Sequence, residues 1–291
     1  MPAVRLGPLY MMGATLAFTL MVTLVKVARQ ELSAMEIIVW RGLVAVPIAG
    51  ALALRVGLRP RNTRVVALRA VLGFTAMSLY FTAAKGLPVA DLSIITRIQP
   101  LLVAALAPLV LGADERVGWH VWVILAVGLG GCAAILAPDM SAGGVDGLVA
   151  AGATLLAAGA HLTLRLLART DDPRVVVFWF QVVMLLFAGV GVTFETGRPL
   201  TVPTAGLVPV VIAAGIAAIV GQVLLTVAYR EDRAAVVAAA GYTGPAWAVI
   251  ADLAIWGVVP TAHVIIGGLV VIGAGLVLVL KTDRAAAIEP S

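Results

Sequence analysis

The chain has 291 residues, of which 62% are apolar and 12% are charged, and its formal net charge is +5. Soluble globular domains are close to half apolar and a quarter charged, so this composition excludes an ordinary water-soluble fold. The basic residues stand in short breaks between apolar runs and not along one amphipathic face, which argues against a nucleic acid as partner. We therefore expect the lipid bilayer to surround most of the surface.

Windows of about nineteen residues predict ten transmembrane helices along the chain. Each apolar run is continuous and has the length of about twenty residues that a helix needs to cross a bilayer, whereas barrel strands would alternate in shorter segments. The expected spans are roughly 8–28, 35–55, 65–85, 89–111, 119–138, 147–168, 175–195, 204–228, 234–256 and 261–281. The sequence therefore predicts an all-α membrane protein.

Lysine and arginine residues are distributed unevenly between the two ends of the expected spans. Fourteen of them, Arg69 included, fall on one side, four fall on the other, and Arg41 and Arg97 lie inside spans. The positive-inside rule places the richer side in the cytoplasm. We therefore expect a multi-pass protein of the cytoplasmic (inner) membrane with both termini in the cytoplasm.

A pattern in the first half of the chain recurs in the second half. An apolar helix carries a proline near its middle, and a turn glycine follows twelve residues later: Pro100 and Gly112, then Pro245 and Gly257. Each half contains five spans, an odd number, so the second half must enter the membrane with opposite polarity. We expect two inverted five-helix repeats, residues 1–140 and 141–291, around a central cavity.

Several motifs resemble those of a known family. They are Arg41 in the second span, the approach Ala84-Lys85-Gly86-Leu87-Pro88-Val89-Ala90-Asp91 to the fourth, Gln99-Pro100-Leu101 within it, and the turn Leu111-Gly112 before a glycine-rich fifth span. Together they resemble the drug/metabolite transporter superfamily, EamA type, over essentially the whole chain. The family usually has a Leu-Gly-Glu turn, whereas this chain continues with Ala113, Asp114 and Glu115, which leaves open which acid caps the turn.

The resemblance implies ten helices with inward termini around a cavity lined by spans one to four and six to nine. It also implies a small-molecule substrate without fixing which one, since members of the family move amino acids, aromatic compounds, nucleotide-like cofactors and vitamins. No Walker sequence, Cys/His metal spacing or nucleophile elbow appears in the chain. We therefore expect no metal, no cofactor and no enzyme activity.

Polar groups inside a bilayer are costly, so each needs a partner or a water-filled cavity. Arg41 and Arg97 are expected roughly 10 and 12 Å below the outer membrane face, from the helical rise per residue, and Asp252 is expected near the same face. An arginine there can bind a substrate carboxylate or phosphate with its planar guanidinium. The alternative is a permanent ion pair with Asp252 that only holds spans together.

Arg97 stands three residues before Pro100, and Tyr242 stands three residues before Pro245. An inverted symmetry would bring these two side chains to facing places near the midplane. Each proline removes a backbone hydrogen bond and kinks its helix, which frees a carbonyl for a ligand or for water. We expect Arg97, Tyr242 and the neighbouring Gln99 to contact substrate. The alternative is a kink that only shapes the cavity.

Other spans carry the remaining polar candidates. His161 in the sixth span has an ordinary pKa near physiological pH, so it is a candidate for carrying a coupling proton, as is Asp252. The alternative for His161 is a plain hydrogen bond between helices. Further substrate contacts are expected from two amides, which could equally bridge helices, and from two aromatic side chains: Gln181, Gln222, Tyr80 and Trp40.

These features favour a secondary carrier that works by alternating access and exports or exchanges a small polar or charged metabolite, amino-acid-like in character. Two alternatives remain: a lipid flippase or scramblase of the same fold, and an intramembrane enzyme that acts on lipid-linked substrates. Small residues four apart, such as Ala126 and Gly130, allow close packing of helices within one chain or between two. We therefore expect a monomer or a weak homodimer.

Overall fold

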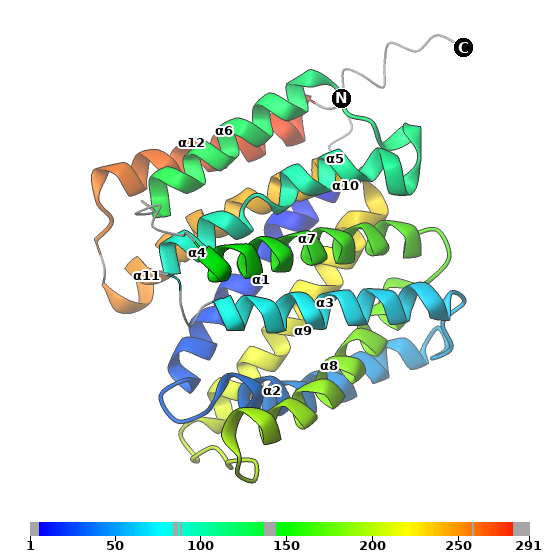
Figure 1. Ribbon diagram of the computed structural model, residues 1–291, viewed down its shortest axis with the longest axis vertical. Coiled ribbons are helices and arrows are strands. Elements are labelled where there is room, and N and C mark those ends of the chain that lie inside the picture. Colours follow the sequence, from blue (N-terminus) through cyan, green and yellow to red (C-terminus); the bar gives the residue numbers. More distant parts are fainter. Residues whose placement is uncertain (1–5, 84–86, 88, 137–143, 258, 282–291) are drawn as a thin grey trace.

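The computed structural model describes residues 6–83, 87, 89–136, 144–257 and 259–281, and among them it contains helices and no β-strand (Figure 1). The elements, including two short 3-10 turns named η1 and η2, are α1 (Leu6–Ala28), α2 (Ala34–Leu54), α3 (Thr63–Ala83), α4 (Val89–Thr96), α5 (Gln99–Leu111), η1 (Ala113–Glu115), α6 (Trp119–Leu136), α7 (Gly144–Leu167), α8 (Pro173–Thr196), α9 (Val208–Glu231), α10 (Ala234–Ala240), η2 (Gly241–Thr243), α11 (Gly244–Trp256) and α12 (Ala262–Lys281). The all-α prediction is confirmed for these residues. Outside them lie the expected boundary near residue 140 and four residues of the motif before the fourth span: Ala84, Lys85, Gly86 and Pro88.

Eight helical segments of the described residues are long and apolar enough to cross a membrane. They are α1, α2, Ile94–Leu111, α6, α7, α8, α9 and Ala234–Trp256. The other two expected spans correspond to α3, which contains Arg64 and Arg69, and to α12, whose apolar helix covers Ala262–Val277 among the residues with described side chains. This is the pattern of a multi-pass membrane protein, and the number of ten spans stays a prediction.

The long helices pack in pairs that join distant parts of the chain. α1 lies along α9, α3 along α7, α2 along α8, and α6 along α12 (Figure 1). Small residues allow these close approaches. A methyl group added at Gly267 of α12 would lie 2.7 Å from the Gly131 carbonyl oxygen of α6, and one at Gly7 of α1 would lie 3.3 Å from the Ala228 carbonyl oxygen of α9. In these two pairs the helix backbones therefore approach closely.

Two crossings of the bundle are broken near their middles. α4 ends at Thr96 and α5 begins at Gln99, with Pro100 in the first turn of the new helix. In the second half, α10 ends at Ala240, η2 follows, and α11 begins with Pro245 in its first turn. Proline has no N–H to donate, so it fits the first turn of a helix, where that group has no partner. Each break interrupts the regular backbone inside the bundle.

A buried carboxylate fastens one end of the bundle. Glu115 of η1 is 2% exposed, and its Oε1 accepts a hydrogen bond of 2.7 Å from Arg165 Nε at the end of α7. Its Oε2 accepts from the backbone N–H of Ala234, the first residue of α10, at 2.8 Å. Arg165 also donates to the carbonyl oxygens of Tyr229 and Arg230 at the end of α9. One acid thus connects α5, α7, α9 and α10.

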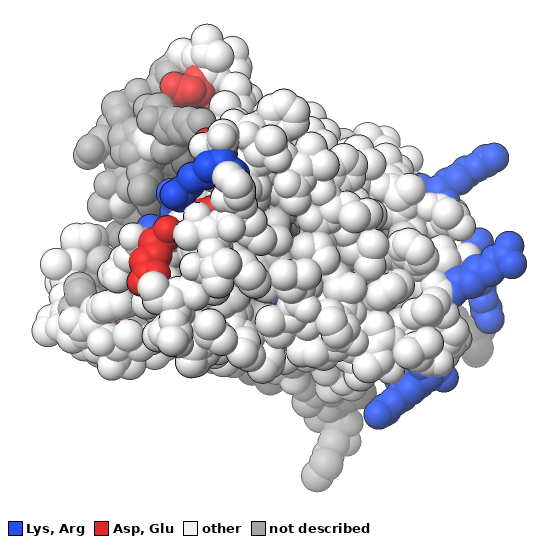
Figure 2. Space-filling view, turned by 90° about the horizontal axis from the view of Figure 1, so that it is seen from below, with Lys and Arg blue, Asp and Glu red and all other residues white. Residues whose placement is uncertain are grey.

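Charged side chains gather at the ends of the molecule. Figure 2 shows lysine and arginine at one end, both signs of charge at the opposite end, and a broad band of other residues between them. The connection from α2 to α3 contributes exposed arginines: Arg55, Arg59, Arg61 and Arg64.

Arg69 does not belong with these end charges. The sequence analysis counted it among them, but its side chain is only 4% exposed. That assignment was wrong because Arg69 stands almost two turns inside α3, where neighbouring helices cover it. The membrane orientation itself stays a prediction.

Candidate functional site

Three neighbouring cavities meet at the break between α4 and α5. The first, of about 290 Å³, is lined by α3, α4, α5, α7 and α8. The second, of about 220 Å³, is lined by α1, α4, α5, α7, α9, α10 and η2. The third, of about 590 Å³, follows α1 and α11. Gln99 and His161 line both the first and the second, and Thr15 and Arg97 line both the second and the third. We call the three together the central cavity.

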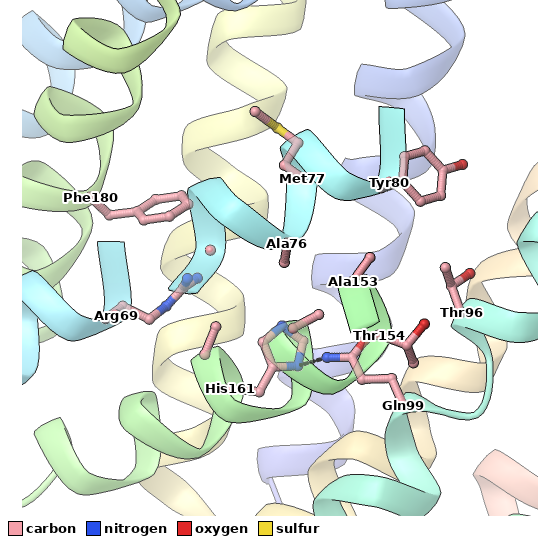
Figure 3. A pocket seen from close by; sticks show the side chains of 13 residues that line it. Arg69, Ala76, Met77, Tyr80, Thr96, Gln99, Ala153, Thr154, His161 and Phe180 are labelled. Carbon is pink, nitrogen blue, oxygen red and sulfur yellow. Dashed lines mark hydrogen bonds between the residues drawn. The ribbon is translucent and has the colours of Figure 1, made fainter. Parts of the chain in front are cut away.

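The first cavity has polar groups on opposite sides and small residues between them. Figure 3 places Arg69 and Phe180 on one side and Tyr80 and Thr96 on the other. Much of the remaining wall consists of glycine and alanine: Gly73, Ala76, Ala153, Ala157 and Ala160. Because these side chains are so short, the space between the helices stays open for a ligand.

Arg69 is a buried cation without an ionic partner. Its guanidinium carbon lies 4.2 Å from the centroid of the Phe180 ring, and its Nε has no hydrogen-bond partner. Among the described residues Arg69 forms no ion pair. A cation–π contact contributes about 0.5–2 kcal/mol, whereas removing a charge from water costs several kcal/mol. The ring alone therefore does not compensate the burial of this charge, and an anion in the first cavity would.

His161 connects three helices at the centre of the cavity. Its Nδ1 lies 2.7 Å from Gln99 Nε2 of α5 and 3.2 Å from the Tyr229 hydroxyl of α9. In this orientation the Gln99 amide nitrogen is a donor, so Nδ1 is the acceptor of that hydrogen bond. A second proton on the ring would remove that acceptor. Protonation of Nδ1 of His161 would therefore break the hydrogen bond with Gln99, or the Gln99 amide would have to flip so that its oxygen faces the ring.

Arg97 lines the second and third cavities from the break itself. Its Nε is buried without a hydrogen-bond partner, and its Nη1 lies only 3.3 Å from where a methyl group at Gly244 would stand. Asp252 lines the third cavity too, but among the described residues these two charges form no ion pair. Toward the end of α1, the Lys26 ammonium lies 5.3 Å from the centroid of the Trp256 ring. Arg97 thus remains available to a ligand.

Four further expected contacts line none of these cavities. Trp40 donates its indole N–H to the carbonyl oxygen of Thr201 at 2.8 Å, so it fastens α2 to a loop. Gln181 is 2% exposed, and its Nε2 has no partner. The other two, Arg41 and Gln222, are half-buried in α2 and α9. For these four the substrate contact stays a prediction.

Tyr242 is also placed away from the cavity. Its ring packs on α6, where a methyl group added at Gly128 would lie 2.5 Å from its Cδ2. The side chain is 2% exposed, and its hydroxyl has no hydrogen-bond partner. Of the two residues that the sequence pattern paired, Arg97 lines the space where a ligand would fit and Tyr242 does not.

The two fully buried carboxylates, those of Glu36 and Glu115, accept hydrogen bonds from backbone N–H groups. Glu36 accepts from the N–H of Ser33 at 2.7 Å and from that of Thr201 at 3.0 Å, which completes a capping box at the start of α2. Glu115 holds Arg165 and the start of α10. In the part of the chain that the structure describes, no group of three or more His, Cys, Asp or Glu side chains could hold a metal ion.

Two site residues escaped the sequence analysis. Arg69 was counted with the end charges, although it is followed by an apolar run that continues to Ala83, and that context was the available signal. Tyr229 was assigned to the loop before the ninth span, but it lies within α9 and is fully buried. Its proximity to His161 had no sequence signal, because the two residues are far apart in the chain.

Residues 5–137 match the EamA-like transporter family. A pseudopaline exporter of Pseudomonas aeruginosa is 30% identical over 275 residues, which are 94% of this chain and 95% of the exporter. The chain belongs to the EamA-like transporter family. A riboflavin transporter of Rhizobium johnstonii is 25% identical to this EamA-like chain over 216 residues, which are 74% of the chain and 70% of that transporter.

A solved crystal structure has the same fold as this EamA-like transporter. The alignment has a TM-score of 0.81 and covers 98% of this chain and 99% of the other, at 16% sequence identity. That identity is too low to carry a function. The family and the named relatives make the chain a metabolite transporter of the drug/metabolite transporter superfamily and not an enzyme, as the motifs predicted.

The unusual turn of this EamA-like transporter keeps a buried acid. Gly112 has a φ of 108°, a conformation that favours glycine, and it ends α5. Of the two acids that follow, Asp114 is exposed and Glu115 is buried in the contacts with Arg165 and Ala234. Glu115 is therefore the acid that holds the turn, two residues later than in the usual Leu-Gly-Glu pattern.

Proposed function

We propose that this transporter is a secondary carrier that exports or exchanges a small polar or charged metabolite, amino-acid-like in character, across the cytoplasmic membrane by alternating access. The observation that carries the proposal is the central cavity, in which Arg97, Gln99, His161 and Tyr80 meet at a broken helix. Irregular backbone at membrane depth is typical of binding sites in carriers. Relatives named for pseudopaline export and riboflavin transport support a metabolite as cargo.

Alternating access would follow from two inverted five-helix repeats, residues 1–140 and 141–291. In such a repeat α1 corresponds to α7, and α3 corresponds to α9. The α1–α9 and α3–α7 pairs are then equivalent by symmetry, while the α2–α8 and α6–α12 pairs lie on the axis. Among the described helices these four pairs make the most extensive contacts. This pairing supports ten spans, with α4–α5 and α10–α11 each counted as one.

Transport in proteoliposomes tests the carrier function. Vesicles loaded with unlabelled amino acids should take up labelled amino acids by counterflow, because a carrier exchanges substrate across the bilayer without an energy source. Protein-free vesicles and vesicles with heat-denatured protein are the controls. If a fluorescent phospholipid changes leaflets in these vesicles while no water-soluble tracer moves, the protein is a lipid scramblase and the carrier proposal is wrong.

The proposed orientation puts both termini in the cytoplasm. Arg61 and Arg198 are exposed at connections that should lie on opposite sides of the membrane. Arg198→Cys should react with an impermeant thiol reagent added to intact cells, whereas Arg61→Cys should react only after the cells are opened. The native Cys132 is buried and should contribute little background. Labelling of Arg61→Cys from outside would reverse the topology. Crosslinking yields of the same variants would separate a monomer from a weak homodimer.

His161 is the proposed site of proton coupling, with Asp252 as the second candidate. His161→Gln keeps a hydrogen-bonding group near Gln99 and Tyr229 but cannot carry the proton. We expect this variant to lose accumulation driven by a pH gradient while counterflow continues. Gradient-driven accumulation equal to that of the unchanged protein would remove His161 from coupling, and Asp252→Asn would then be the variant to test.

A further inference from the structure

Two arginines stand in separate parts of the central cavity, and neither has an ionic partner among the described residues. We propose that the cavity binds a substrate with two separated anionic groups, one held by Arg69 in the first cavity and the other by Arg97 in the second and third. This inference rests on the proposed carrier function and narrows its substrate class. An extended dicarboxylate, or a carboxylate joined to a phosphate, has the required chemistry.

Arg69 supplies the first anion site. Phe180 lies on one face of its guanidinium and Gly73 lies against Nη1, so the group is held in place by packing. A methyl group at Gly73 would stand 2.6 Å from Nη1 and 3.0 Å from the Phe180 ring. The planar guanidinium has donors on its edge, and a carboxylate can accept two parallel hydrogen bonds from it. The open side of this group is the first cavity (Figure 3).

Arg97 supplies the second anion site. It comes from the backbone break that separates α4 from α5, and its Nη1 lies against Gly244 of the second half of the chain. A ligand bound there would contact residues of both halves, as a carrier needs if binding is to change how the halves pack. Asp252 shares the third cavity and forms no ion pair with a described residue, and Lys26 adds a further positive charge there.

The charge balance of the described lining favours an anionic ligand. The cationic residues are Arg69, Arg97 and Lys26, and the acidic one is Asp252, so three positive charges face one negative charge. Among the described residues that line the first and the second cavity, none is acidic. A neutral amino acid brings one carboxylate and one ammonium, which would leave this excess unchanged. A dianion would neutralise it.

The distance between the two sites sets the shape of the ligand. Arg69 and Tyr80 lie on the same helix about three turns apart, which is roughly 16 Å of rise. Tyr80 lines the first cavity and also the third, where Arg97 lies. The two guanidinium groups line different cavities, and the proposal gives each of them its own anionic group. The two groups would then stand on a linker of several atoms, which Gln99 and His161 would face near its middle.

A length series of dicarboxylates tests the proposal directly. Binding of succinate, adipate, suberate and sebacate to the purified full chain in nanodiscs is measured by calorimetry, and the monomethyl ester of each acid is the control with one charge. We expect one of the longer diacids to bind at least tenfold more tightly than its monoester. Equal affinity for diacids and monoesters would overturn the proposal, as would a preference for succinate that falls with length.

Variants of each arginine assign the two sites. Arg69→Gln and Arg97→Gln should each reduce diacid binding to the level of the monoester, while binding of the monoester through the remaining arginine shows that the variant is folded. A diacid preference that survives both substitutions would show that the charges are not the recognition groups. Chloride is added as a competitor to each single variant, which retains one arginine. If chloride displaces the diacid and the monoester equally well in both variants, the arginines are independent halide sites and the proposal fails.

Gly73→Ala tests the position of Arg69 without changing any charge. The added methyl group would displace Nη1, so we expect loss of the diacid preference with monoester binding retained. Gly159→Ala on the facing helix is the matched control, because its methyl group would meet only Leu72 at an ordinary 3.5 Å. An unchanged diacid preference in Gly73→Ala would count against Arg69 as an anion site.

Counterflow separates this inference from the carrier function. If labelled amino acids exchange at the same rate whether or not the diacid is present, the chain is a carrier and the dianion proposal is wrong. If the diacid binds in preference and yet neither diacid nor amino acid crosses the vesicle membrane, the binding site is as proposed and the carrier function is wrong.

Discussion

The break between α4 and α5 and the break at η2 between α10 and α11 share a sequence pattern and differ in their surroundings. Each lies before a proline that begins a new helix. Around the first, residues 94–99 are half-buried or exposed, and Arg97 and Gln99 line the cavity. Around the second, every residue from 234 to 246 is buried. The first break directs the polar side chains of Arg97 and Gln99 into the cavity, whereas the second meets the cavity wall only through small or apolar residues such as Gly241 and Gly244. We call the first the open break and the second the packed break.

Neighbouring helices cause this difference. α1, α6 and α12 all approach η2: Gly241 lies against Met11, Tyr242 against Gly128, and Thr243 against Gly275. The hydroxyl of Thr243 is also 3.0 Å from that of Thr15. At the first break small residues of α3 and α7 leave a cavity instead. The comparison teaches that a proline break supplies free backbone groups and a bend, and that its neighbours decide whether it binds a ligand.

The strongest test of the packed break is Glu115, which holds the start of α10. Glu115→Ala would leave Arg165, 20% exposed, without its partner and the Ala234 N–H without its acceptor. We expect a loss of about 3 kcal/mol in the free energy of unfolding, measured by thermal unfolding in detergent. Asp114→Ala, at the exposed neighbouring residue, is the matched control and should change little. Equal stability of both variants would mean that Glu115 does not hold α10.

Gly128 tests the contact between α6 and the packed break. The methyl group of Gly128→Ala would lie 2.5 Å from Cδ2 of the buried Tyr242 ring, so the ring or the helix would have to shift. Overpacking of this kind should cost about 1–3 kcal/mol of stability. Gly130→Ala, on the same helix, meets no atom within 4 Å and should be neutral. A Gly128→Ala variant as stable as Gly130→Ala would show that Tyr242 can move, and the contrast between the breaks would weaken.

Arg97 tests the open break through affinity. Arg97→Lys keeps the charge but loses the planar pair of donors, so the apparent affinity for substrate should fall about tenfold, or roughly 1.4 kcal/mol. Stability should change little, because Arg97 has no ion pair in the described chain. The Km for uptake in proteoliposomes measures the effect. Recovery of transport in the double variant Arg97→Gln with Asp252→Asn, when either single change abolishes it, would assign Arg97 to an ion pair instead.

Tyr242 should give the smallest effect. Its hydroxyl has no hydrogen-bond partner and lines none of the three cavities, so Tyr242→Phe should leave the Km for uptake within about twofold of the original value. The sequence pattern alone predicted the opposite, a substrate contact opposite Arg97. A large rise in Km with unchanged thermal unfolding would restore that prediction and make the two breaks functionally equivalent.

Local properties of the chain predicted much of the fold. The apolar runs indicated the helices, and Pro100 and Pro245 indicated both breaks. Proline has no backbone N–H to donate, so it interrupts a helix whatever the neighbouring helices are. Of the expected cavity residues, Arg97, Gln99, Tyr80 and His161 come together in the central cavity. Motifs before and within the fourth span indicated the family, which the comparisons confirm.

The sequence by itself determined that this is an all-α membrane transporter of the EamA-like family, since hydropathy and motifs are properties of short stretches. The tertiary structure decided which polar groups share a cavity: Arg69 enters it, while Trp40 and Tyr242 pack elsewhere. The reason is physical. In a membrane the lipid-facing and protein-facing sides of a helix are both apolar, so the sequence does not reveal which side turns inward. Only the packing of neighbouring helices fixes that rotation.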